Sequence, residues 1–135
     1  MTSSTTSISE HGPTWSEEAV TGFGMSVGGP ANVFRPETVE QVADAFADVS
    51  RRGASLALRG AGCSYGDASN NIGGHVLDLT SMNKILSFDP ATGVAMCEPG
   101  VTIRDLWKRS IGYGFWPRVV SGTMQVTMGG AAAMN

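Results

Sequence analysis

The sequence is poor in the residues on which several protein classes depend, and each shortage excludes a function. It has two cysteines, Cys63 and Cys97, with no C-x-x-C spacing and no histidine cluster nearby, so neither a disulfide framework nor a metal site is indicated. Charged residues make up 16% of the chain and the net charge is −3, which gives no electrostatic basis for binding nucleic acid. No window approaches the roughly 18 consecutive apolar residues that a membrane span requires. The sequence therefore predicts a globular protein with no nucleic-acid partner and no integral membrane segment.

The N-terminus lacks the basic region and the apolar core of a secretory signal peptide. Residues 1–13 are rich in serine and threonine, and we expect them to form a disordered tail. Residues 14–135 are expected to form one domain, because the chain is too short for a typical two-domain enzyme. We expect a cytoplasmic protein, or one at the periphery of a membrane or the cell envelope if the chain belongs to a longer protein.

Glycine is the residue that the sequence has in excess. The chain has 18 glycines in 135 residues, nearly twice the average usage of about 7%. Glycine permits positive φ and leaves the backbone bare, so several N–H groups can converge on an anion. The main candidate is the loop at residues 59–71, whose G-x-G-x-x-x-G spacing fits neither the Rossmann fingerprint nor a Walker A loop. An ordinary glycine-rich connection between two strands is the alternative at this point.

The pattern of apolar runs and turn residues predicts two α/β halves. Strands are expected at residues 31–34, 55–59, 75–79, 84–88 and 94–98, after an extended lead-in at 14–30. Residues 31–79 then form a β-α-β-loop-β half, and residues 84–111 form a hairpin followed by a helix. The glycine loop leaves the C-terminal end of its strand, which is where open α/β units bind ligands.

Two helices are predicted from their capping residues. Thr38 and Gln41 have the spacing of a capping box, and Gly53 is expected to end the helix that they begin. The apolar positions expected to face the core are Val39, Val42, Ala43, Phe46 and Val49. Thr102 and Asp105 are expected to cap the second helix in the same way.

A second glycine-rich segment lies near the end of the sequence. Residues 112–120 are expected to be extended and to lead into a tight turn at Gly122. Thr127 and the pair Gly129 and Gly130 then open a short helix of small residues, whose N-terminal N–H groups would form a second anion site. Close packing of that helix through its small side chains is the alternative. Because the sequence ends inside this helix, we expect a longer protein.

Four segments carry a resemblance to a known family. They are Thr21-Gly22-Phe23-Gly24, Ala31-Asn32-Val33, residues 59–67 and residues 122–131. The chain resembles the FAD-binding domain of the vanillyl-alcohol-oxidase/p-cresol-methylhydroxylase (PCMH-type) flavoproteins, and most closely their decaprenylphosphoryl-ribose oxidase branch. The resemblance implies an α+β fold of two small α/β subdomains, truncated at its C-terminus.

The resemblance also implies FAD as the cofactor, with its pyrophosphate wrapped by the first loop and the second loop on the other side of the cleft. The implied cofactor-binding residues are Leu58, Arg59, Gly60, Ala61, Gly62, Cys63, Ser64, Tyr65, Gly66, Asp67, Ala68, Gly122, Thr127, Met128, Gly129 and Gly130. Many members of the family have a histidine in the first loop that bonds covalently to the flavin. Cys63 occupies that place here, so non-covalent FAD is expected.

The implied activity is that of an FAD-dependent oxidoreductase acting on a CH–OH group of a sugar-type substrate, either a small molecule or lipid-linked. The substrate domain would lie outside this chain, and the chain alone would be inactive. No catalytic residue is assigned, and His75 is expected to be a solvated residue at a strand edge. Two alternatives stay open, namely a stand-alone nucleotide- or anion-binding module and an inactive truncated product.

Overall fold

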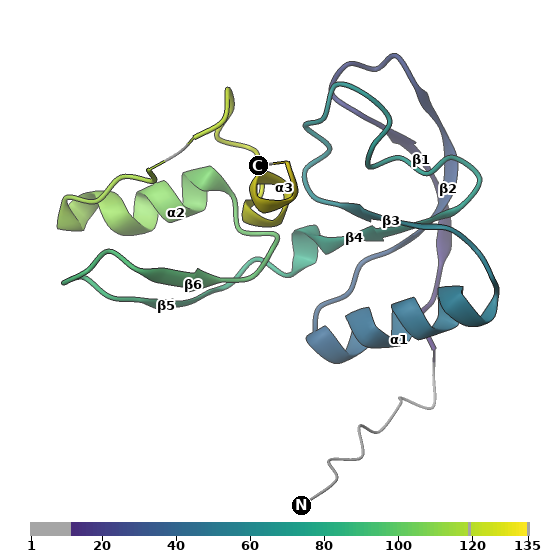
Figure 1. Cartoon of the computed structure of the whole chain (residues 1–135), viewed down its shortest axis with the longest axis horizontal. Coiled ribbons are helices and arrows are strands. Elements are labelled where there is room, and N and C mark those ends of the chain that lie inside the picture. The colour runs from purple at the N-terminus through teal and green to yellow at the C-terminus, as the bar shows by residue number, and fades with distance from the viewer. Residues whose placement is uncertain (1–11, 119, 135) are drawn as a thin grey trace, which may run out of the picture.

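The computed structural model describes residues 12–118 and 120–134, so most of the predicted disordered tail lies outside the described residues. Figure 1 shows two halves side by side, one built around a four-stranded sheet and the other around a two-stranded sheet. The elements in chain order are β1 (Ser16–Thr21), β2 (Gly28–Phe34), α1 (Val39–Arg51), β3 (Leu56–Arg59), β4 (His75–Asp78), η1 (Leu79–Ser81), β5 (Ile85–Phe88), β6 (Ala95–Cys97), α2 (Ile103–Ser110), η2 (Ile111–Tyr113) and α3 (Met128–Ala133). The α+β class and the two α/β halves predicted from the sequence are confirmed.

The first sheet has the strand order β1-β2-β4-β3. β1 runs antiparallel to β2, whereas β2, β4 and β3 are parallel to one another. α1 connects β2 to β3, and β4 enters later, between the two strands that α1 joins. The C-terminal ends of three parallel strands therefore meet at one edge of the sheet, where the glycine loop begins.

β1 is a paired strand within the segment where the sequence predicted only an extended lead-in. Its six residues pair with β2 from Ser16 opposite Val33 to Thr21 opposite Gly28. Among them only Val20 is buried, and it joins Ala31 and Val33 in the apolar core on one face of the sheet. A charged edge strand of this kind gives little hydrophobic periodicity, which explains why the pattern was missed.

Thr38 caps the N-terminus of α1 and the helix ends before Gly53, as predicted, but its N-terminal hydrogen bonds differ from a capping box. The Thr38 hydroxyl accepts from the Gln41 N–H (3.3 Å). The Gln41 side chain accepts from the N–H of Glu37 (2.7 Å) instead of that of Thr38. Gly53 has φ +59°, which suits a residue just after a helix C-terminus.

The prediction for the buried face of α1 was largely wrong. Val39 and Phe46 are 68% and 47% exposed. The buried residues of the helix are Ala45, Asp48 and Val49. Asp48 can lie on the inner side because the Trp15 indole donates to its carboxylate (2.9 Å) and two arginines of α1's last turn and C-cap pair with it. A buried carboxylate that is bonded in this way costs far less than an unpaired one.

The second half is a β5-β6 hairpin with α2 beside it (Figure 1). The predicted capping box of α2 is confirmed, because Thr102 accepts from the Asp105 N–H (3.1 Å) and Asp105 accepts from the Thr102 N–H (3.1 Å). The residues after α2 do not begin as the predicted extended segment. They form the short turn η2, which Gly114 ends with φ +80°.

α3 lies between the two halves in Figure 1. It is tied to the second half by an isolated bridge between Thr102 and Thr127. Among the described residues, no helix has the length and apolar character needed to cross a membrane.

Candidate cofactor-binding site

The first glycine loop follows β3 and carries a row of backbone donors without partners. Among the described residues, no N–H group of residues 61–67 donates a hydrogen bond to a backbone or side-chain acceptor. Gly62 has φ +68°, a left-handed conformation that favours glycine. Successive free N–H groups around such a residue can form an anion-binding concavity.

Arg59, predicted as a cofactor-binding residue, uses its guanidinium within the protein. It donates to the carbonyl of Thr21 (2.8 Å), to the Asn70 side chain (2.9 Å) and to the Ser69 hydroxyl (3.3 Å). Asn70 is fully buried, and it donates in turn to the carbonyl of Val27 (3.1 Å). Arg59 thus joins the start and the end of the loop to the β1–β2 turn.

The second predicted segment folds into a short helix as expected, but its N-terminal donors are not free. The N–H groups of Met128 and Gly129 donate to carbonyl oxygens just before α2 (2.7 and 2.9 Å). The N–H of Gly130 donates to the Thr127 hydroxyl (3.2 Å). The N–H groups that we expected to be free at the start of α3 therefore have partners within the fold, since carbonyl groups distant in sequence accept from two of them.

The structure brings the two predicted segments together at one point. A Cβ atom on Gly60 would collide with the side chain of Thr127, which is itself 2% exposed. Gly122 lies apart from this contact, in an exposed bend, and a Cβ there would meet nothing within 4 Å. Gly60 and Thr127 therefore set the distance between the first loop and α3.

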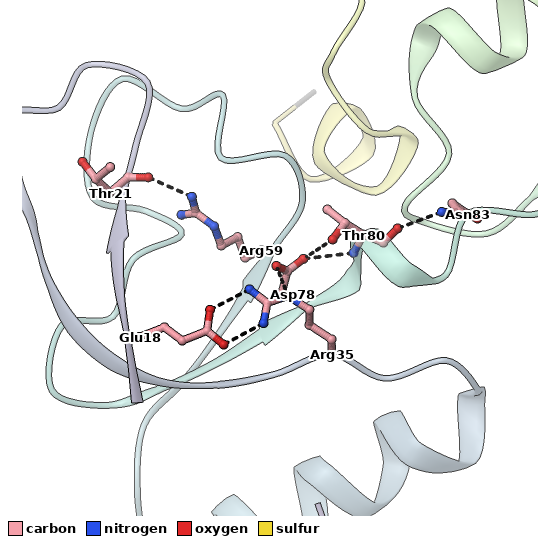
Figure 2. A network of polar contacts seen from close by, with 7 residues as sticks. All are labelled: Glu18, Thr21, Arg35, Arg59, Asp78, Thr80 and Asn83. Carbon is pink, nitrogen blue, oxygen red and sulfur yellow. Dashed lines mark hydrogen bonds and ion pairs between the residues drawn. The ribbon is translucent and has the colours of Figure 1, made fainter. Parts of the chain in front are cut away.

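A polar network that the sequence analysis missed lies next to the loop at the carboxyl edge of the sheet (Figure 2). Arg35, just after β2, donates to both carboxylate oxygens of Glu18 (2.7 and 2.8 Å) and to Asp78 at the end of β4 (3.1 Å). Asp78 also accepts from the N–H and hydroxyl of Thr80 (3.0 and 2.6 Å). In the same view, Arg59 extends away from these residues toward the β1–β2 turn.

The charges in this network reinforce one another. Hydrogen bonds from Arg35 hold the pKa of Glu18 below its usual value, and the bonds to Glu18 are the main reason why the pKa of Arg35 is raised. The sequence signal for the network was the position of Arg35 and Asp78 at the ends of two predicted strands. Parallel strands that share an edge bring such residues together.

Two hollows flank the loop. One, of about 230 Å³, reaches Gly60 and Ala61 and is bounded by the network of Figure 2. The other, of about 430 Å³, lies on another side and is lined by Val27, Leu56, Ala57, Asp67, Ala68, Asn71 and Ile72. The first is smaller than the roughly 300–1,000 Å³ of pockets that enclose a whole ligand, so it fits only part of a dinucleotide.

The side chains of the loop are mostly at the surface. Tyr65 is 77% exposed and packs edge-on against Phe23 of the β1–β2 turn, with ring centroids 5.4 Å apart. Cys63 is a free, half-buried thiol.

His75 differs from its prediction as a solvated residue. It is half-buried at the start of β4, and its ring packs edge-on against Trp15 at 4.6 Å. Its Nδ1 atom is buried and has no partner among the described residues. His75 begins β4, whereas the glycine loop follows the C-terminal end of the parallel β3, so the structure places it away from the candidate site.

The loop fits the diphosphate of a dinucleotide. Its free N–H groups supply donors, and the backbone is open beside Gly66, where a Cβ atom would meet nothing within 4 Å. Within residues 12–118 and 120–134, no three His, Cys, Asp or Glu side chains gather into a candidate metal site.

Comparisons with known proteins show the family of this chain. A family model described as an FAD binding domain matches residues 30–135. Decaprenylphosphoryl-beta-D-ribose oxidase of Mycolicibacterium smegmatis is 38% identical over 96 residues, which are 71% of this chain and 20% of that protein. This chain thus spans about a fifth of the length of that curated relative.

Solved structures show the same fold at low sequence identity. Cholesterol oxidase from Brevibacterium sterolicum superposes with a TM-score of 0.79 at 17% identity, covering 91% of this chain and 24% of that one. 6-Hydroxy-D-nicotine oxidase from Arthrobacter nicotinovorans gives a TM-score of 0.74 at 23% identity, covering 95% of this chain and 29% of that one. The family match, together with the glycine loop and the two α/β halves, shows that this chain belongs to the FAD binding domain family and that its cofactor is FAD.

Proposed function

We propose that this chain is the cofactor-binding part of an FAD-dependent oxidoreductase that oxidises a CH–OH group of a sugar-type substrate. The observation that carries the proposal is the row of unpartnered N–H groups at residues 61–67, with Gly62 in the left-handed conformation. Such a row matches the several oxygens of a pyrophosphate better than a single charged side chain would. The first loop is the main anion site, because the donors at the start of α3 are used within the protein.

The chain's own residues bind and orient the cofactor. The loop backbone would hold the pyrophosphate, and Gly60 and Thr127 set the separation between this loop and α3. When bound, FAD would supply the redox chemistry of alcohol oxidation. No side chain in the described residues is assigned to the chemical step.

The substrate class is suggested by the relative from Mycolicibacterium smegmatis, whose name states a decaprenylphosphoryl ribose as substrate. We propose a sugar-type alcohol for the enzyme to which this domain belongs, small or lipid-linked. The part of the enzyme that selects the sugar would lie in the sequence that the relative has and this chain does not.

Calorimetry with three ligands tests the cofactor assignment. The chain is titrated with FAD, ADP and inorganic pyrophosphate under the same conditions. The proposal predicts tighter binding of FAD than of ADP, because the isoalloxazine adds contact, and flavin absorbance that stays with the protein after desalting. Equal affinity for FAD and ADP would instead support a nucleotide- or anion-binding module without a redox role. Absence of binding to all three would refute both.

We further propose that the FAD is held without a covalent bond. The family resemblance implies that Cys63 takes the place of the linking histidine, and its thiol donates to the carbonyl oxygen of Ala61 (3.9 Å). Acid precipitation of the FAD-loaded protein should release all flavin into the supernatant. Flavin in the pellet that disappears in Cys63→Ser would show a cysteinyl link and overturn this assignment.

A further inference from the structure

The turn between β1 and β2, residues 21–25, packs directly against the backbone of the first glycine loop. A Cβ atom on Gly22 would lie 2.6 Å from the carbonyl oxygen of Ser64 and 2.7 Å from that of Gly66. A Cβ atom on Gly24 would collide with the carbonyl oxygen of Tyr65. Neither glycine has a positive φ, so other residues could adopt these backbone conformations. It is the lack of space that requires glycine here.

The contacts show which way the loop peptides face. The carbonyl oxygens of Ser64, Tyr65 and Gly66 all approach the turn, and the first accepts from the N–H of Phe23 (2.9 Å). In a planar trans peptide, the N–H of the next residue points opposite to the carbonyl. The N–H groups of residues 65–67 therefore point away from the turn, toward the open side of the loop.

The turn is itself fixed in place. Met25 closes it by donating its N–H to the carbonyl of Gly22 (3.1 Å), with a φ of +50° that is unusual for a residue other than glycine. Arg59 reaches it from the end of β3 and donates to the carbonyl of Thr21 (2.8 Å), as Figure 2 shows. A backbone held in a sparsely populated conformation persists only where its surroundings enforce it.

We propose that the β1–β2 turn, residues 21–25, is a positioning element for FAD binding, an inference that rests on the proposed function of the loop. The turn holds three loop carbonyls on one side, so that three consecutive N–H groups face the pyrophosphate before it arrives. Arg59 takes part by anchoring the turn and does not contact the phosphates. Such pre-organisation raises affinity because fewer groups have to be ordered on binding.

Three alanine variants test the proposal. Gly22→Ala and Gly24→Ala each place a methyl group against loop carbonyls, and Gly112→Ala is the matched control because a Cβ there meets nothing within 4 Å. Folding is checked by circular dichroism, FAD affinity by calorimetry, and the exchange of loop amides by hydrogen–deuterium exchange without FAD. We expect both turn variants to bind FAD at least ten-fold more weakly than Gly112→Ala and to exchange the amides of residues 61–67 faster.

Each outcome decides the matter. Folded turn variants with the FAD affinity and loop exchange of Gly112→Ala would overturn the proposal. Loss of folding in both would also overturn it, because the turn would then belong to the core and not to the site. A wild-type chain that takes up no FAD would remove the proposed function, and faster loop exchange in the variants would still show that the turn orders the loop.

Discussion

Gly60 and Thr127 lie far apart in the sequence, yet the Thr127 hydroxyl occupies the space that a Cβ atom on Gly60 would need. Gly60 begins the cofactor loop, and Thr127 caps α3 while bridging to Thr102 in the other half of the domain. This contact joins the glycine loop of the first half to α3 and, through Thr102, to the second half.

Replacing Gly60 by alanine should strain this contact. The methyl group has no room beside Thr127, and overpacking of this kind typically costs about 1–3 kcal/mol of unfolding free energy. Urea denaturation of Gly60→Ala beside Gly112→Ala measures the loss. The double variant Gly60→Ala/Thr127→Ala should lose less than the two single variants together, because it removes the atoms that collide. Strict additivity would contradict a direct contact.

Thr127→Ala alone separates packing from ligand binding at α3. Removing the hydroxyl that caps the helix should cost about 1 kcal/mol of stability. Because the first N–H groups of α3 already have partners in the protein, FAD affinity at a temperature where the variant is folded should change by no more than a few-fold. A loss as large as that caused by changes in residues 61–67 would show that Thr127 is a cofactor ligand.

Gly62→Val should abolish FAD binding and also destabilise the fold. The left-handed φ of +68° costs an L-residue about 1–2 kcal/mol, and a Cβ atom would collide with the guanidinium of Arg59. The substitution therefore disturbs the bonds of Arg59 to the β1–β2 turn as well as the backbone conformation that orients the N–H groups of the loop. Thermal unfolding and FAD titration check the two effects separately. Normal affinity in a folded variant would remove the loop from the site.

Asp48 should make the stability of the domain pH-dependent at acidic pH. The hydrogen bond from Trp15, followed by Arg52 and Arg51, holds its pKa below the usual value. A carboxyl group with a lower pKa in the folded state stabilises the fold fully above its unfolded pKa of about 3.9, and that contribution is lost as the pH falls through the folded pKa.

The variant Asp48→Asn should accordingly be less stable than wild type at pH 7, and the difference should shrink toward pH 3. Urea unfolding at several pH values measures it, with Glu37→Gln as a control at an exposed carboxylate. A difference that stays constant between pH 7 and pH 3 would show that the ionised carboxylate is not the stabilising form.

The parts of this fold that the sequence predicted are those with local signals. The hydroxyl groups of Thr38, Thr102 and Thr127 each cap a helix by accepting from the N–H three residues later. The glycine loop was likewise visible because glycine reports a backbone requirement directly. The buried face of α1 was not predictable, because it depends on Trp15, a residue far away in sequence that satisfies Asp48.

The candidate site shows the same division. The first loop became a candidate because of its own composition, but the hydrogen bonds made by Arg59 and by the N–H groups of α3 were not predicted. That Arg59 is bonded inside the protein, and that the donors of α3 reach carbonyls before α2, are consequences of non-local pairing. Sequence patterns indicate which groups can donate hydrogen bonds, but only the folded chain shows which donors remain free.

The position of β4 has a consequence for how the domain folds. β4 is the middle strand of the three parallel strands, yet both of its neighbours, β2 and β3, come before it in the sequence. The parallel pairing therefore cannot form until the connection at residues 60–74 brings β4 back between them. Closing a connection and forming contacts distant in sequence both slow folding. The cofactor loop is part of that connection. FAD can therefore bind a formed loop only after β4 has paired with its neighbours. Substitutions that stiffen the loop should change the refolding rate. Substitutions in the β5-β6 hairpin should mainly change the unfolding rate.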